Sequence, residues 1–233
     1  MKATKKIIIA VDGHSSCGKS TLSKEVAKKI GIGYVDTGAM YRSVTLYGMR
    51  KGIVSDDELR TEELVSRLGE ISISFKFDQE KGRNTTYLNG ENVEDEIRTI
   101  EVSRNVSKVS AIKEVRAKLT DWQRHAADEG SVIMDGRDIG TVVFPQADLK
   151  VFMTATAEVR AQRRYDELIG KGEQANYEEV LANVKERDEI DSTREVSPLR
   201  KADDALLLDN SNLSREEQYD VVIGWLKERN LVE

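Results

Sequence analysis

The chain has 233 residues and a formal net charge of −6, from 36 basic and 42 acidic side chains. Charged residues make up 33% of the chain and apolar residues 39%, a composition typical of an ordinary globular protein. The acidic balance argues against a protein that coats nucleic acid, and no apolar stretch reaches the length of a membrane-spanning helix. We therefore expect neither a nucleic-acid partner nor a membrane partner.

The cysteine content indicates the cellular compartment. Cys17 is the single cysteine in the sequence, so no intramolecular disulfide can form. This favours a reducing compartment, and we expect a cytoplasmic protein. The apolar run at residues 7–11 is shorter than the core of a secretory signal and is interpreted as a buried first strand.

Short apolar runs alternate with segments of helical periodicity, a pattern typical of an α/β protein with a parallel sheet. The predicted core strands are residues 6–11, 33–35, 131–134, 149–153 and 205–208. The predicted helices are residues 19–30, 39–50, 111–129, 157–169, 177–189 and 215–229.

One region interrupts this alternation. Residues 71–77 alternate apolar and polar side chains, a turn is predicted at 81–84, and residues 85–93 carry a further strand with an Asn89-Gly90 hairpin turn. This pattern predicts an antiparallel β insert within the α/β chain. The predicted division is a core of residues 1–57, 108–156 and 196–233, an insert of residues 58–107, and a charged helical segment of residues 157–195.

Gly13, Gly18, Lys19 and Ser20 have the spacing of a phosphate-binding loop between a predicted strand and a predicted helix. Glycines let the backbone wrap so that its N–H groups point at phosphate oxygens, and the helix N-terminus adds positive charge. Lys19 is predicted to reach the β- and γ-phosphates of a nucleotide, and Ser20 to ligate Mg²⁺. A chance glycine-rich turn is disfavoured because strand and helix are both in place. The predicted nucleotide contacts in the loop are Gly13, His14, Ser15, Ser16, Cys17, Gly18, Lys19, Ser20 and Thr21.

Two groups of polar residues are predicted at the carboxyl ends of strands, where α/β sheets bind ligands. They are Asp36, Thr37 and Arg42 after the second strand, and Asp135, Arg137 and Asp138 after a later one. Acids at such a place could hold Mg²⁺ through water or orient a ligand, and an arginine could bind a phosphate or carboxylate. The alternative for the second group is an exposed turn with local ion pairs.

Arginines gather on the two helices of the charged segment. They form one cluster of Arg160, Arg163 and Arg164, and a second group in which Arg187, Asp191 and Arg194 are expected on one helical face. Such a run by itself is more often a solvated, ion-paired face. Beside a phosphate loop, however, arginines on a mobile segment suit phosphoryl transfer, because they neutralise developing charge and exclude water on closure.

The segments GHSSCGKST, DTGAMYR, EIR, DGRDIGTVVFP and ERDEIDSTR together resemble the bacterial cytidylate kinases, a family of P-loop nucleoside monophosphate kinases. The resemblance runs essentially end to end. It implies transfer of the γ-phosphoryl group of ATP to CMP or dCMP with Mg²⁺ as cofactor, giving CDP or dCDP and ADP. It also implies that the insert, residues 58–107, holds the acceptor and that residues 157–195 close over ATP as a lid. We expect a monomer.

The resemblance assigns roles to individual residues. It implies catalytic roles for Lys19, Arg137, Arg187 and Arg194, an ATP contact for Arg163 and a metal contact for Ser20. The implied acceptor-binding residues are Asp36, Thr37, Arg42, Arg98, Arg116, Asp135, Arg137, Asp138, Arg187 and Asp191. The sequence departs from the family at Thr37, usually a serine, and at His14, frequently a proline.

Two other functions stay open on the sequence. The first is a P-loop kinase with another small acceptor, such as uridylate or shikimate. The second is a regulatory switch that binds GTP, although the guanine-reading NKxD motif expected of such a switch does not occur in the sequence.

Overall fold

The structure is a computed structural model that describes residues 1–78, 83–128 and 130–233. The chain divides into two compact units, one of residues 1–36 with 123–233 and one of residues 37–122. The phosphate loop and the charged helical segment belong to the first unit, and the predicted β insert belongs to the second.

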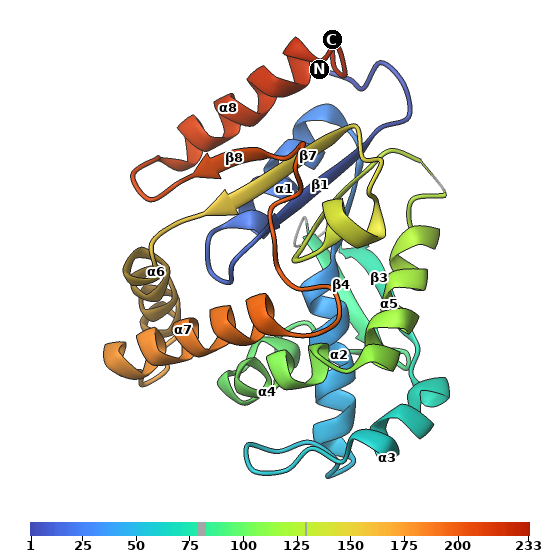
Figure 1. Cartoon of the computed structure of the whole chain (residues 1–233), viewed down its shortest axis with the longest axis vertical. Coiled ribbons are helices and arrows are strands. Elements are labelled where there is room, and N and C mark those ends of the chain that lie inside the picture. The colour runs from blue at the N-terminus through green and yellow to red at the C-terminus, as the bar shows by residue number, and fades with distance from the viewer. Residues whose placement is uncertain (79–82, 129) are drawn as a thin grey trace. The chain divides into compact units, whose positions relative to one another are not determined.

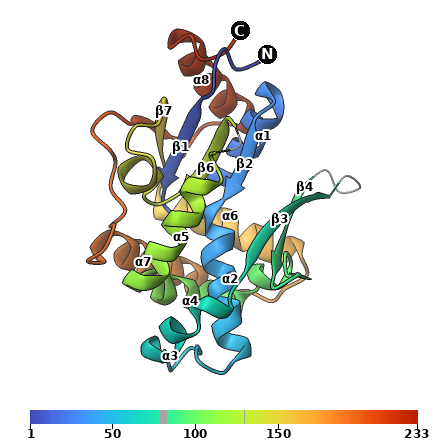
Figure 2. The same ribbon diagram turned by 90° about the vertical axis from the view of Figure 1, so that its right-hand side faces the viewer.

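A five-stranded parallel sheet forms the centre of the first unit. Its order is β2 (Gly33–Asp36), β6 (Val132–Gly136), β1 (Ile8–Gly13), β7 (Leu149–Thr154) and β8 (Leu206–Asp209). Figure 2 shows β6 between β1 and β2, and Figure 1 shows β7 between β1 and β8. All five strands run parallel, so the predicted α/β fold with a parallel sheet is confirmed.

The sheet is covered on both faces, which explains the unbroken apolar run of β1. Ile9 and Val11 pack in the cluster that includes buried side chains of two helices, whereas Ala10 packs in a separate cluster on the other side. Helices of this unit are α1 (Lys19–Ile30), α6 (Ala157–Gly170), α7 (Tyr177–Thr193) and α8 (Arg215–Glu228). The first cluster includes side chains of α1 and α8, so these helices bury the face that carries Ile9.

The carboxyl end of β1 turns sharply into the phosphate loop. Gly13 has φ +147°, and a Cβ atom there would lie 2.0 Å from the carbonyl oxygen of Met153 in β7. Only glycine fits this close approach of two backbones. Neighbouring strands end at the same level, because Asp12 is in register with Gly136 and Asp36 with Asp135.

The second unit combines helices with a small antiparallel sheet. Its helices are α2 (Thr37–Arg50), α3 (Thr61–Ser66), α4 (Ile100–Ser110) and α5 (Lys113–His125), which continues into the first unit, and its strands are β3 (Ile73–Asp78), β4 (Arg83–Leu88) and β5 (Glu91–Asn92). Short 3₁₀ turns are η1 (Leu68–Glu70) and η2 (Glu96–Arg98).

The predicted Asn89-Gly90 hairpin is confirmed. It joins β4 to β5, and both turn residues have positive φ, 49° and 86°. Such angles belong to the type I′ turn, for which Asn-Gly is favoured. Of the turn predicted at 81–84, residues 81 and 82 lie outside the described residues, and residues 83 and 84 belong to β4.

Two helices of the second unit were not predicted, α3 and α4. In α4 the buried side chains include Val102, Val106 and Val109, at helical spacing, but β-branched residues have low helix propensity. The helix predicted at 111–129 is α5, which begins at Lys113 and ends at His125. The predicted insert lies within the second unit, which begins at Thr37, and its role as a separate module stays a prediction.

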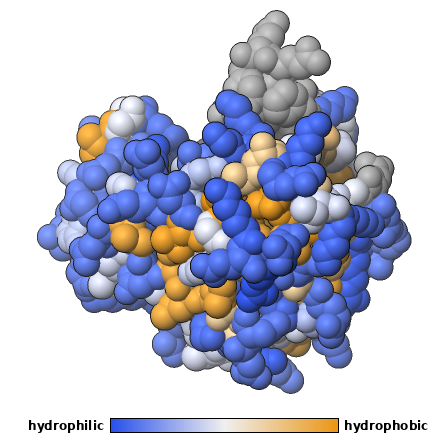
Figure 3. Space-filling view, turned by 90° about the horizontal axis from the view of Figure 1, so that it is seen from above, coloured by the Kyte–Doolittle hydropathy of each residue, from blue (hydrophilic) through white to orange (hydrophobic). Residues whose placement is uncertain are grey.

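The surface agrees with the charged composition. The face drawn in Figure 3 is mostly hydrophilic, with apolar side chains in patches between the charged ones. Across the described ranges, no helix has the length and apolar character needed to cross a membrane.

Candidate active site

The loop between β1 and α1 wraps around the amino group of Lys19. Lys19 Nζ donates hydrogen bonds to the carbonyl oxygens of Gly13, at 2.8 Å, and His14, at 2.6 Å. The side chain is buried, and this burial lowers the pKa of Lys19 below its ordinary value. Ser16 and Gly18 take left-handed conformations, with φ 58° and 91°, which curl the backbone. A curled loop that leads into a helix N-terminus is a site for phosphate groups.

The residues of the loop differ in exposure. Ser15, Cys17 and Lys19 are buried, whereas Thr21 is exposed on the first turn of α1. The ring of His14 meets the ring of Phe152 edge-on, with 6.0 Å between the centroids. Burial lowers the pKa of His14, and the positive charges of neighbouring arginines and Lys19 act in the same direction, whereas Asp188 opposes it.

A carboxylate at the end of β6 contacts the first turn of α1. Ser20 Oγ donates to Asp135 Oδ2 at 2.8 Å, and the Tyr34 hydroxyl donates to Asp135 Oδ1 at 2.7 Å. Burial and the negative charge of Asp36 raise the pKa of Asp135 to about 6, against the opposing effect of Lys19. Asp135 and Asp138 are 4% and 3% exposed. The alternative of an exposed turn is therefore wrong.

The oxygen atoms around Ser20 fit a magnesium ion. Ser20 offers a hydroxyl, and Asp36 and Asp135 offer carboxylates from adjacent strands in register. Mg²⁺ prefers oxygen ligands and is usually held by one or two carboxylates together with substrate phosphates and water. Within the described part of the chain, no group of three or more His, Cys, Asp or Glu could hold a metal ion.

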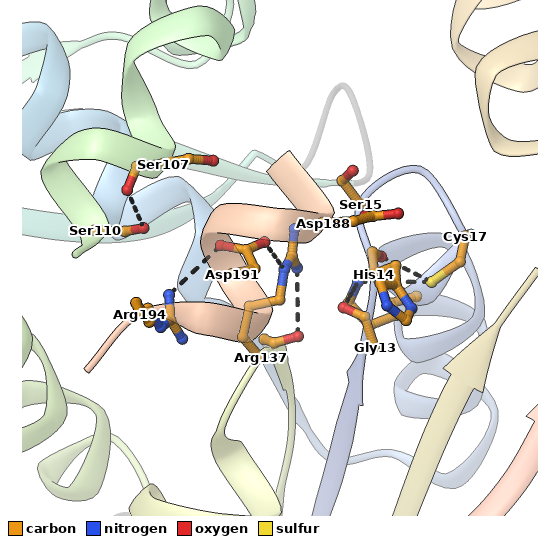
Figure 4. A network of polar contacts seen from close by, with 12 residues as sticks. Gly13, His14, Ser15, Cys17, Ser107, Ser110, Arg137, Asp188, Asp191 and Arg194 are labelled. Carbon is orange, nitrogen blue, oxygen red and sulfur yellow. Dashed lines mark hydrogen bonds and ion pairs between the residues drawn. The ribbon is translucent and has the colours of Figure 1, made fainter. Parts of the chain in front are cut away.

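Asp191 joins two of the predicted arginines, as Figure 4 shows. Arg137 Nε donates to Asp191 Oδ2 at 2.7 Å, and an Arg194 nitrogen lies 3.5 Å from Asp191 Oδ1. Burial by itself would raise the pKa of Asp191, but Arg137 and Arg187 hold it below its ordinary value. The structure therefore brings together residues from three places in the chain. Arg137 follows β6, Asp191 lies in α7, 54 positions later, and Arg194 comes directly after α7.

Arg187 adds a further positive charge to this group. Burial, followed by repulsion from Arg137, lowers the pKa of Arg187 to about 10, although Asp191 acts in the opposite direction. A lowered arginine pKa means that the surroundings disfavour its charge. A bound polyanion would relieve this repulsion, so the group is electrostatically suited to phosphate.

Arg194 departs from its predicted place on the helical face. Helix α7 ends at Thr193, and Arg194 has an extended ψ of 143°. Its guanidinium donates two hydrogen bonds to the Ser197 carbonyl oxygen, at 2.9 and 2.7 Å. The contact with Asp191 is therefore made from the segment after the helix rather than from the same helical face.

The predicted cluster of arginines on α6 has separate partners. Arg160 forms a two-pronged ion pair with Asp188 of α7, at 2.9 and 2.6 Å, and donates to the Ala155 carbonyl. Arg164 pairs with Glu167 on its own helix, at 2.9 Å. The i, i+3, i+4 spacing places these residues near one another, and Arg160 also donates to the Ser15 carbonyl of the phosphate loop at 3.5 Å.

Arg163 reaches the phosphate loop through Asn210. Its guanidinium donates to the Asn210 side-chain oxygen at 3.1 Å and to the Asn210 carbonyl at 2.8 Å. Asn210 Nδ2 in turn donates to the Cys17 carbonyl at 2.6 Å. Asn210 is 1% exposed, so this hydrogen bond holds the loop from the buried side.

In the second unit, Thr37 begins α2 and is buried. Arg42, five residues further along α2, donates to the Ile97 carbonyl at 3.1 Å and to Ser103 Oγ at 2.9 Å. These bonds connect α2 with η2 and α4, and they hold the Arg42 guanidinium in one orientation.

The other two predicted arginines of this unit have different surroundings. Arg98 forms a two-pronged contact with Glu94, at 2.9 and 2.7 Å. Arg116 is 2% exposed, donates to the Ser110 carbonyl at 3.0 Å, and lies over the Tyr41 ring at 5.3 Å from its centre.

The family was identified by comparison with known proteins. The family model described as cytidylate kinase matches residues 9–228. The chain belongs to the cytidylate kinase family. The match includes the phosphate loop, Asp135 to Asp138, and the segment from Arg187 to Arg194. The resemblance inferred from the sequence motifs is therefore confirmed.

Individual relatives agree with the family match. The cytidylate kinase of Bacteroides fragilis is 60% identical over 92% of this chain and 93% of that protein. The cytidylate kinase of Bacteroides thetaiotaomicron is 56% identical over 97% of this chain and 96% of that protein. That of Flavobacterium johnsoniae is 55% identical over 94% of this chain and 95% of that protein. A crystal structure of an uncharacterized protein from Eubacterium ventriosum has a TM-score of 0.52 at 12% identity, covering 96% of this chain and 99% of that one. This last similarity concerns the fold alone.

Sequence reasoning missed several residues that support this cytidylate kinase site. Tyr34 bonds Asp135, Asp188 bonds Arg160, and Asn210 bonds the loop at Cys17. Asp188 adjoins Arg187 in the sequence, so its charge was visible. Nothing in the spacing of Tyr34 or Asn210 indicates their partners, which are 101 and 193 positions away.

Proposed function

We propose that this chain is an ATP-dependent kinase that transfers the γ-phosphoryl group of ATP to CMP or dCMP, giving CDP or dCDP and ADP. The observation that carries the proposal is the family match over residues 9–228, which spans a phosphate loop closed around Lys19 and a group of arginines joined by Asp191. Together these features supply a binding site for the phosphates of the donor nucleotide and positive charge for a second phosphate group.

The phosphate loop binds ATP. Lys19 exchanges its two loop carbonyl partners for oxygens of the β- and γ-phosphates, and backbone N–H groups from Gly13 to Thr21 surround the remaining oxygens. Arg163 contributes to the ATP site through Asn210, which holds the Cys17 carbonyl. Binding of phosphate requires little further free energy to desolvate Lys19, because the folded protein already buries its amino group.

Mg²⁺ is the proposed cofactor, held by Ser20 with Asp135 nearby and by phosphate oxygens. When bound, the ion neutralises negative charge on the phosphates. Asp135 and Tyr34 orient the Ser20 hydroxyl toward this place.

The acceptor phosphate supplies the attacking oxygen. This phosphate is largely ionised near neutral pH, so the reaction needs no strong general base. The main task is to bring two polyanions together and to stabilise the charge that spreads over the transferring group. Arg137, Arg187 and Arg194 perform it, and Asp191 fixes the first and last of them.

The remaining assignments concern the acceptor and the lid. Acceptor contacts are proposed for Asp36, Thr37, Arg42, Arg98, Arg116, Asp135, Arg137, Asp138, Arg187 and Asp191. The insert of residues 58–107 binds the acceptor, residues 157–195 close over ATP, and residues 1–57, 108–156 and 196–233 form the core. The protein acts as a cytoplasmic monomer.

An acceptor panel tests the proposal. ADP formation from ATP is measured with CMP, dCMP, UMP, AMP and shikimate in a coupled assay, with Lys19→Met as the inactive control. We expect CMP or dCMP to give the highest kcat/KM. Faster turnover with UMP or shikimate would mean that this compound, and not cytidylate, is the acceptor. Slow nucleotide hydrolysis with no acceptor would indicate a switch.

A further inference from the structure

Asp12, in β1 directly before the phosphate loop, carries a carboxylate that the proposed reaction does not use. Asp12 Oδ1 accepts a hydrogen bond from the Ile139 N–H at 2.7 Å, and Oδ2 accepts one from the Gly140 N–H at 2.7 Å. Asp12 is 5% exposed. The two amides open the helical turn Ile139–Val143, which follows Asp138 directly.

The geometry requires two acceptor oxygens. Backbone N–H groups that bond a carboxylate form strong, charge-assisted hydrogen bonds. An asparagine at position 12 would offer one oxygen and turn its NH₂ group toward the second N–H, donor against donor. Burying a carboxylate is costly without compensating bonds. The paired contact to Ile139 and Gly140 supplies those bonds.

The turn is also confined on its other side. A Cβ atom on Gly140 would lie 3.3 Å from Asp12 Oδ2 and 3.1 Å from Lys150 Cδ. Lys150 is held in turn, because its Nζ donates to the Pro145 carbonyl at 2.7 Å and to Asp204 at 2.8 Å. Gly140 thus fits tightly between the Asp12 carboxylate and the stem of Lys150, and a Cβ atom there would require these neighbours to shift by a few tenths of an ångström.

We infer that Asp12 is a positioning residue, which fixes the turn after Asp138, and with it Arg137, relative to the phosphate loop that begins at Gly13. Asp138 is tied to the same turn, because its carbonyl accepts the N–H groups of Val142 and Val143. Displacement of the turn would move Arg137 away from Asp191. The inference rests on the proposed function, in which Arg137 stabilises the transferring phosphoryl group.

The first test compares two carboxylates at opposite ends of β1, each of which accepts hydrogen bonds from backbone N–H groups. Asp12→Asn should lower kcat for CMP on the order of 10²-fold, because small displacements of positioned groups have effects of this size, with little change in the KM for ATP. The matched control is Asp148→Asn: Asp148 Oδ2 accepts the Ile8 N–H at 2.9 Å at the opposite end of β1. This control should lower the thermal midpoint while kcat stays unchanged.

A second variant leaves the charge in place. Gly140→Ala pushes the turn from the carboxylate, so kcat should fall less than in Asp12→Asn, and the double variant should fall little beyond Asp12→Asn alone. Gly224→Ala, where a Cβ meets nothing within 4 Å, is the matched control and should keep kcat. Should Asp12→Asn fail to fold, Gly140→Ala carries the test. Wild-type kcat in a folded Asp12→Asn protein, or in Gly140→Ala if Asp12→Asn does not fold, overturns the inference.

Hydrogen exchange separates this inference from the proposed function. The amides of residues 139–140 should be protected in the wild-type protein without nucleotide and lose protection in Asp12→Asn but not in Asp148→Asn. Unchanged protection in Asp12→Asn overturns the inference whatever the activity. A wild-type protein with protected amides but no activity on CMP or dCMP would refute the proposed function. The contact of Asp12 with the turn at residues 139–140 would still be supported.

Discussion

Ser20 in the first turn of α1 donates a 2.8 Å hydrogen bond to Asp135 at the end of β6, although the two residues are 115 positions apart. The bond connects the phosphate loop with the strand that carries the Asp135-to-Asp138 motif. It exists because β6 lies directly beside β1 in the sheet, so that both chain segments leave the sheet at the same edge. The proposed metal site is built on this contact.

The Ser20 hydroxyl should set the magnesium requirement. Ser20→Ala removes the proposed ligand, and we expect the Mg²⁺ concentration for half-maximal activity to rise by about tenfold or more. Activity is measured against Mg²⁺ at saturating ATP and CMP. Ser23→Ala, a buried serine three positions further in the same helix, is the matched control and should keep the wild-type requirement. An unchanged requirement in Ser20→Ala would remove Ser20 from the metal site.

Asp135 should make stability depend on pH. Its pKa in the folded protein is about 6, above the ordinary value of 3.8, chiefly because of burial and the charge of Asp36. The folded state therefore binds this proton more tightly than the unfolded state. The resulting stabilisation is fully present below about pH 4 and is lost as the pH rises through about 6.

Comparison with Asp135→Asn measures this contribution. Free energies of unfolding from urea titrations between about pH 4 and pH 8 are subtracted at each pH, which cancels the groups that do not interact with Asp135. The wild-type protein should gain stability relative to Asp135→Asn as the pH falls. A difference independent of pH would mean that Asp135 titrates at its ordinary value.

Arg187 should matter for turnover more than for folding. Its charge is already disfavoured by burial and by Arg137, so removing it relieves repulsion in the free protein. Arg187→Ala should lower kcat on the order of 10²–10³-fold, as expected for loss of a charge-stabilising donor, while the thermal midpoint changes little. Lys185→Ala on the same helix, whose side chain is 59% exposed, is the control. Intact turnover in Arg187→Ala would contradict its catalytic role.

The Arg160–Asp188 pair should stabilise the packing of α6 on α7. The Arg160 side chain is 5% exposed, so Arg160→Ala breaks a largely buried ion pair and should cost about 3 kcal/mol of unfolding free energy. Arg164→Ala breaks the more exposed pair with Glu167 and should cost less than about 1 kcal/mol. Denaturant titration of both variants checks the difference. Equal costs would show that burial does not strengthen the Arg160 pair.

The amino-acid sequence by itself determined the elements whose signals are local. The apolar run of β1, the glycine spacing from Gly13 to Gly18, and Asn89-Gly90 each constrain the backbone within a few residues, so the strand, the loop and the hairpin could be predicted. The motifs also sufficed to identify the family. Helix α4 was missed because its valines have low helix propensity, whereas in the structure Val102, Val106 and Val109 are buried and the Thr99 side chain caps the helix N-terminus.

The tertiary structure decided which side chains meet. Ser20 contacts Asp135 because the strand order β2-β6-β1-β7-β8 places β6 beside β1. Arg137, after β6, contacts Asp191 of helix α7, 54 positions away. The tertiary structure also gave different partners to Arg160, Arg163 and Arg164, which are Asp188, Asn210 and Glu167. Local periodicity specifies the face of a helix or strand. The partner across that face depends on how the whole chain folds back, and this is a property of the packed structure.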